Sequence, residues 1–174
     1  MSTPTPNNWY AIFTRPRAEK KVYQRFIDLG YTAYLPLVTT LKQWSDRKKK
    51  VKTPLISSYV FIQIDEQYIY DVLNVPSTLG VLKYLGKLAI VRNEEIENLK
   101  LLLNNKDAIQ IVEKANFSKD EEVEVIRGPL AGLKAFYVEE KGKHRVLIKI
   151  DALDRYFAAE IPLSFIKKIK STAA

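Results

Sequence analysis

The chain has 174 residues, and 47% of them are hydrophobic, which is enough to bury a core in one domain or in two small ones. It has no cysteine and one histidine, which excludes disulfides, thiolate metal sites and histidine-based metal cages or triads. Carboxylates lie in mixed-charge surroundings without an acid–base pair, and no nucleotide-binding glycine loop is present. We therefore expect no enzyme, no cofactor and no metal.

The formal net charge of +8 is concentrated in one segment of the chain. Residues 15–52 contain eleven basic side chains against three acids, a net of +8, so the remainder of the chain is balanced. A localised basic field attracts polyanions and makes their binding dependent on salt. A solubilising surface is the alternative, but the concentration of the whole excess in one segment favours a nucleic acid.

The beginning of the chain has no targeting signal that we can identify. Residues 1–7 are polar with two prolines and are predicted to be a flexible lead-in. They lack the basic start and apolar stretch of a secretion signal, and no run has the length of a membrane-spanning helix. We expect a cytoplasmic monomer without a membrane partner.

The first half of the chain alternates between predicted strands and helices. Residues 8–13 alternate as a strand does, and residues 17–29 show helical spacing of apolar side chains, with Gly30 at the helix end. The remaining predictions are strands over residues 31–38 and 58–64, a charged hairpin over 39–53, a helix over 66–74, short strands within 80–91 and a helix beginning at Asn93.

The second half is rich in strand patterns and has no convincing helix. Five runs are predicted to be strands: residues 123–126, 136–138, 145–150, 157–161 and 165–169. Five strands match a small closed barrel, and closure removes the edges that an open sheet would expose. Before them, from residue 106 to 119, the periodicity fades, and we expect a linker or a loosely paired strand. His144 is predicted to be a solvated turn residue.

Two motifs together resemble the NusG family of transcription elongation factors. Residues 123–140, with alternating apolar side chains around the Gly128-Pro129 turn, resemble a KOW motif. Residues 8–22, then Leu35-Pro36-Leu37 and residues 54–62, resemble the opening of a NusG amino-terminal domain in the family's order. The resemblance covers nearly the whole chain.

The resemblance implies an α+β fold of two domains. Residues 8–105 would form the NusG amino-terminal domain, an antiparallel sheet with flanking helices in an α/β sandwich. Residues 106–119 would be the linker, and residues 120–170 would form a five-stranded KOW β-barrel. Family members dock a small-subunit ribosomal protein or the termination factor Rho through this barrel, where Leu130 takes the place of an apolar turn residue. Leu130 capping the barrel is the alternative.

The resemblance also implies two binding sites on the first domain. An aromatic concavity would hold the clamp helices of the largest RNA polymerase subunit, and its residues would be Phe13, Tyr59 and Phe61 with Trp9, Pro36 and Ile56 nearby. Basic side chains would contact the non-template DNA and the upstream duplex: Arg15, Arg17, Lys20, Lys21, Arg25, Arg47, Lys48, Lys49 and Lys50. The alternatives are that the rings fill the protein's own core and that the cations are ordinary solvated charges.

The implied function is transcription elongation and antitermination, with suppression of pausing and termination. Residues 41–49 followed by residues 52–55 resemble the specialised UpxY-like antiterminators, which serve long surface-polysaccharide operons. Two alternatives stay open: a general NusG that couples transcription to Rho and ribosomes, and a ribosome-associated RNA-binding KOW protein.

Overall fold

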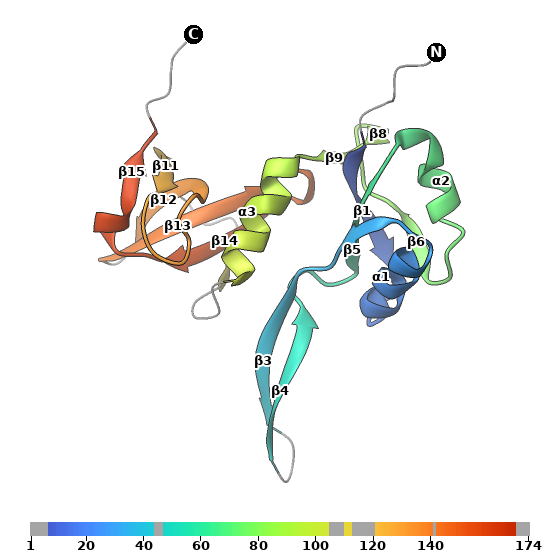
Figure 1. Cartoon of the computed structure of the whole chain (residues 1–174), viewed down its shortest axis with the longest axis horizontal. Helices are drawn as coiled ribbons and strands as arrows, with labels where there is room; N and C mark the ends of the chain where they lie inside the picture. Colours follow the sequence, from blue (N-terminus) through green and yellow to red (C-terminus); the bar gives the residue numbers. More distant parts are fainter. Residues whose placement is uncertain (1–6, 44–46, 105–109, 113–120, 141, 170–174) are drawn as a thin grey trace. The chain divides into compact units, whose positions relative to one another are not determined.

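The computed structural model describes residues 7–43, 47–104, 110–112, 121–140 and 142–169 (Figure 1). The chain divides into two compact units, Met1–Asn93 and Glu94–Ala174. Each is built around an antiparallel sheet with few helices, which confirms the expected mixture of strands and helices. No helix in the described ranges is long and apolar enough to cross a membrane.

The sheet of the first unit is organised around β1 (Asn8–Thr14), which has partners on both edges. One edge pairs with β5 (Tyr59–Ile64), and the far edge of β5 takes β2 (Thr32–Tyr34). The other edge of β1 is shared by β6 (Thr78–Val81) and β9 (Ile90–Val91). This double pairing fixes which face of the sheet every β1 side chain occupies.

Helices cover one face of this sheet. The helix α1 (Glu19–Asp28) packs on β2 and β5, and the short helices η1 (Glu66–Tyr68) and α2 (Ile69–Val72) follow β5. The core beneath them includes buried residues of α1, α2, β1 and β5: Tyr10, Ile12, Val22, Phe26, Val60, Ile62, Ile69 and Val72. The apolar stripe of α1 therefore faces the sheet, as its sequence spacing predicts.

The ends of α1 are fixed by specific backbone contacts. Gly30 has a φ of 83°, and the Tyr31 N–H donates to the Phe26 carbonyl at 2.9 Å, the arrangement of a Schellman motif. At the other end, Glu19 is buried, and its Oε1 accepts the Ser58 N–H at 2.8 Å. The first turn of α1 thereby fixes the backbone immediately before β5.

Two hairpins extend this unit. The strands β3 (Leu37–Gln43) and β4 (Lys48–Pro54) pair with each other and with no other strand in the described residues, and they leave the sheet as a two-stranded arm (Figure 1). The smaller hairpin joins β7 (Lys83–Tyr84) to β8 (Lys87–Leu88) and lies between β6 and β9 in the chain. The predicted charged hairpin is therefore confirmed.

The second unit contains the five predicted strands and one more. The strands are β10 (Gln110–Val112), β11 (Glu121–Val125), β12 (Lys134–Glu140), β13 (Lys143–Ile150), β14 (Arg155–Glu160) and β15 (Ile166–Lys168), with the turns η2 (Asp151–Leu153) and η3 (Leu163–Phe165). The order is β10-β14-β13-β12-β11-β15. Within the described residues no pairing joins the two end strands, so the expected closed barrel is not found. The extra strand β10 occupies the edge of β14 that closure would use.

The helix α3 (Asn93–Asn104) confirms the helix predicted at Asn93, and two of its side chains bind backbone groups of the second unit. Glu95 is buried and its Oε1 accepts the Asp151 N–H at 3.0 Å. The Asn98 side chain donates to the Lys134 carbonyl at 3.0 Å. The units divide at residues 93 and 94, whereas the sequence predicts the domain boundary at residue 105, and that boundary stays a prediction.

Replacing Glu95 by Ala should destabilise the second unit, because the Asp151 N–H loses the charged acceptor that the buried Glu95 side chain supplies. We expect a loss of about 1.5–3 kcal/mol in the free energy of unfolding. The neighbouring Glu94 forms an exposed ion pair with Lys134 at 3.1 Å, and Glu94→Ala should cost at most about 1 kcal/mol. Urea unfolding of both variants measures the difference, and equal losses would show that α3 is not anchored through Glu95.

Replacing Gly128 by Ala should destabilise the turn between β11 and β12. Gly128 has a φ of 80°, and an added Cβ would lie 2.7 Å from a carbon of the Phe165 ring. Gly132, with a φ of 89° and no atom within 4 Å of its added Cβ, is the matched control. Gly132→Ala should cost about 1–2 kcal/mol from backbone strain, and Gly128→Ala about 1–3 kcal/mol more. Thermal unfolding that ranks the two variants the other way would contradict the placement of Phe165.

Candidate functional site

The register of β1 and β5 places aromatic side chains together on the face of the sheet opposite the helices. Phe13 lies opposite Tyr59, and Ala11 lies opposite Phe61. The ring centroids of Phe13 and Tyr59 are 4.6 Å apart and the rings are tilted by 42°, a geometry that is typical of attractive aromatic pairs. The alternate β1 side chains belong to the helix-covered core. The sheet therefore separates a core face from an aromatic face.

The six predicted polymerase-binding residues differ in exposure. Phe13 and Tyr59 are half-buried and keep part of each ring at the surface. The other four are buried: Trp9, Pro36, Ile56 and Phe61. The Trp9 indole N–H donates to Asn93 Oδ1 at 3.1 Å, so its polar atom has an internal partner. Of the six, only Phe13 and Tyr59 are not fully buried.

Gly80 leaves the space beside Phe13 open. The residue lies opposite Phe13 in the pairing of β6 with β1, and an added Cβ would meet no atom within 4 Å. The absence of a side chain therefore exposes the edge of the Phe13–Tyr59 pair. Sequence reasoning missed Gly80 because its register against β1 is a non-local property of the sheet.

Two of the predicted DNA-binding cations are held by backbone carbonyls. Lys20 Nζ donates to the carbonyl of Lys52 at 2.5 Å, which links α1 to the base of the β3–β4 arm. Arg25 Nη1 donates to the carbonyl of Pro76 at 2.6 Å, which links α1 to the turn before β6. Each side chain therefore connects α1 to a neighbouring backbone segment, a role that the sequence did not reveal.

The remaining cations near α1 are exposed. Arg15 and Arg17 lie in the connection between β1 and α1, and Lys21 lies in the first turns of the helix. Arg17 has a φ of 65°, a left-handed conformation that is uncommon for a residue other than glycine. The Arg15 N–H donates to the Ser77 carbonyl at 3.0 Å, so the connection is fixed against the turn before β6. The backbone is anchored while the basic side chains face solvent.

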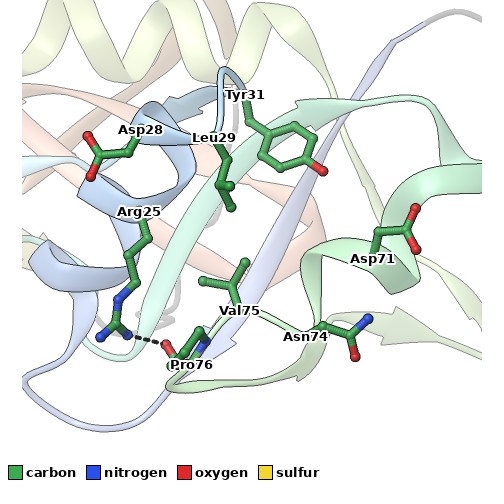
Figure 2. Close-up of a pocket in the computed structure, with 8 residues that line it drawn as sticks. All are labelled: Arg25, Asp28, Leu29, Tyr31, Asp71, Asn74, Val75 and Pro76. Carbon is green, nitrogen blue, oxygen red and sulfur yellow. Dashed lines mark hydrogen bonds between the residues drawn. The ribbon is translucent and has the colours of Figure 1, made fainter.

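An open groove of about 580 Å³ lies beside Arg25, between the end of α1 and the turn after α2 (Figure 2). Its walls combine an aromatic ring, an aliphatic side chain and groups that donate or accept hydrogen bonds: Tyr31, Leu29, Arg25, Asp28, Asp71 and Asn74. Val75 and Pro76 complete the lining. A flat ligand with hydrogen-bonding edges, such as a nucleobase, suits this chemistry. The sequence places these residues in two separate segments, and only the fold joins them.

The β3–β4 arm presents two different faces. Paired residues share a face, so Lys48, Lys50 and Lys52 lie on one side together with Leu41. Three pairs on this side are exposed in both residues: Thr39–Lys52, Leu41–Lys50 and Gln43–Lys48. The other side carries Lys49 and then half-buried Val51. The predicted cations of the arm are therefore split between an exposed lysine row and a second, partly covered side.

In the second unit, two predicted placements change. Leu130 is 2% exposed, so its side chain contributes to the core of the unit, and a docking role for it stays a prediction. His144 was expected in a turn, and this is wrong, since it lies in β13 opposite Glu139. Its Nδ1 is 2.7 Å from the Tyr137 hydroxyl. Burial raises the pKa of the Tyr137 hydroxyl.

The chain is similar to a known protein family and to solved structures. A family model described as transcription termination factor NusG matches residues 7–100, more than half of the chain. A solved structure described as domain interaction in Thermotoga maritima NusG has 19% sequence identity and a TM-score of 0.48, with 94% of this chain and 98% of that chain covered. The MjSpt4:Spt5 complex in conformation A has 17% identity and a TM-score of 0.31, with 92% and 97% covered. The match of the family model shows that the chain belongs to the NusG family of transcription factors.

Proposed function

We propose that the chain is a non-catalytic transcription elongation and antitermination factor that binds the clamp helices of RNA polymerase. The observation that carries this proposal is the pair of half-buried rings, Phe13 and Tyr59, on the face of the sheet opposite the helices. Rigid aromatic side chains give a large contact area with little loss of conformational entropy. Gly80 leaves room for a partner side chain next to them.

The mechanism needs only binding energy. A factor that binds the closed, processive state of the polymerase more tightly than the paused state shifts the population toward the closed state. Contact with the clamp on one side and with the non-template DNA on the other supplies this preference. Pausing and termination then become less frequent without any chemical step on this chain.

Contact with the non-template strand is assigned to the surface that joins β1, α1 and the groove. Arg15, Arg17 and Lys21 supply exposed positive charge for phosphates. The groove beside Arg25 supplies an aromatic wall at Tyr31 and an amide at Asn74 for an unpaired base. Lys20 and Arg25 act mainly through the carbonyls that they hold.

The exposed lysine row of the β3–β4 arm is assigned to the phosphates of the upstream duplex. Such contacts are independent of sequence and weaken with salt. The row alternates along β4, so Lys48, Lys50 and Lys52 face the same direction from a strand that is tied to α1 at its base. The arm thus presents positive charge at a fixed distance from the first sheet.

The second unit is proposed to be a KOW domain that recruits a small-subunit ribosomal protein or Rho. The specialised, UpxY-like role in long surface-polysaccharide operons rests on the sequence of the arm. A general NusG role is the second candidate, and the match to a family described as a transcription termination factor supports it. Transcription in vitro on a template with a Rho-dependent terminator distinguishes them, because a specialist increases read-through and a general factor increases termination.

Gly80→Glu should weaken binding to core RNA polymerase without unfolding the protein. The added carboxylate enters open space beside Phe13, where a docked partner would have to bury it without a counter-charge. We expect a loss of at least about tenfold in affinity, similar to that of Phe13→Ala or Tyr59→Ala. Tyr70→Glu, which adds the same charge on the helix α2 where Tyr70 is 61% exposed, is the control and should bind normally. Unchanged affinity of Gly80→Glu would contradict the assignment of this face.

Neutralising the exposed lysine row should reduce the salt dependence of duplex binding. The double variant Lys48→Gln with Lys50→Gln should lower the slope of log K against log salt by about 1.8, the value for two lost phosphate contacts. The control is Lys49→Gln, which removes one exposed charge from the other side of the arm and should leave the slope nearly unchanged. Fluorescence anisotropy at several salt concentrations measures both, and an equal change of slope per removed charge would show that the arm binds through its total charge.

A further inference from the structure

The loop of the β7–β8 hairpin has a residue that its backbone conformation does not favour. The loop consists of Leu85 and Gly86, with φ values of 48° and 79°. Two positive φ values in a two-residue hairpin loop define the type I′ geometry, for which Asn, Asp or Gly is preferred at the first position. A leucine there is strained by its Cβ. Local backbone geometry therefore does not explain the choice of leucine.

Packing does not explain it either. Leu85 is 86% exposed, and the adjacent Tyr84 is 72% exposed. Neither side chain stabilises the folded chain by burial to a useful extent. A strained residue with an exposed apolar side chain at a hairpin tip is typical of a contact site for another molecule.

The charges around the tip favour one class of partner. Lys83 and Lys87 flank the two apolar side chains, and both are exposed. The segment from residue 82 to 92 contains a third cation, Arg92, and no acidic residue. In the hairpin register Tyr84 pairs with Lys87, so an aromatic ring and a cation lie next to each other at the tip. A polyanion with exposed flat rings complements this surface in both charge and shape.

We propose that the β7–β8 tip is a second nucleic-acid contact that binds unpaired bases. Tyr84 stacks on an exposed base, Leu85 inserts beside it as an apolar wedge, and Lys83 and Lys87 contact the flanking phosphates. Stacking tolerates any base, so this contact is independent of sequence. The site is separate from the Arg25 groove and from the lysine row, and it goes beyond the proposed contact with the polymerase clamp.

The test uses the full chain and a fluorescein-labelled single strand of about 16 nucleotides. Tyr84→Ala should weaken binding by about fivefold or more, the lower end of the contribution of one stacked base. Tyr68→Ala is the control, because Tyr68 is 51% exposed and lies beside Glu66 rather than beside lysines. Leu85→Gly and Leu85→Asn should raise the melting temperature by relieving strain and yet weaken binding. A structural role for Leu85 predicts no loss of affinity in these variants, and that result would overturn the proposal.

A photocrosslinking amino acid at position 84, compared with one at position 50 in the exposed lysine row, separates this inference from the proposed function. Crosslinking of the labelled strand from position 84 supports the tip as a nucleic-acid site. If position 50 crosslinks to nucleic acid and position 84 does not, the tip inference fails while DNA binding by the arm stands. If position 84 crosslinks to core RNA polymerase instead of the strand, the tip is a protein contact and the proposal is overturned.

Discussion

The first unit depends on the pairing of β1 with β5. Because successive side chains of a strand point to opposite faces, one register decides which residues join the helix-covered core and which lie on the other face. In this register Phe13 meets Tyr59 and Ala11 meets Phe61, while Tyr10 and the alternate residues of β5 enter the core. A shift by one residue would exchange the two sets. The proposed polymerase contact is therefore a consequence of the same pairing that holds the sheet together.

The basic side chains divide into those that shape the unit and those that remain accessible. Lys20 and Arg25 hold carbonyls of the arm and of the turn before β6. These ties position the exposed cations, including Lys48 and Lys50 on the arm. The excess positive charge in residues 15–52 is thus held in defined positions on the surface. A polyanion can therefore bind it at a defined place.

Local patterns in the sequence predict much of this fold. The alternation in residues 8–13, the helical spacing before Gly30 and the five strand runs of the second half each depend on neighbours within a few residues, and all are found. The sequence left a linker or a loosely paired strand open where β10 lies, and it did not show the burial of Glu95, because the partners Phe157 and Asp151 are far away in the chain. Closure of the expected barrel also depends on long-range pairing, and no closing pair is found among the described residues.

The candidate site was predictable only in part, because some of its features follow from local alternation and others depend on long-range pairing. Phe13 and Tyr59 could be placed on one face from period-two alternation and from the family resemblance. The burial of Trp9 and Phe61, the open space at Gly80 and the groove beside Arg25 depend on registers and turns that join distant segments. The position of His144 in a strand follows from its pairing with β12 rather than from its charged neighbours.

The most direct test of the central claim is site-specific photocrosslinking from position 59 in a stalled elongation complex assembled with purified polymerase. The account predicts a crosslink from position 59 to the clamp helices of the largest subunit. It predicts no such crosslink from a probe that replaces Tyr68 in the short helix η1 of this chain. Crosslinks from Tyr68 but not from position 59, or no crosslink to the clamp from position 59, would contradict it.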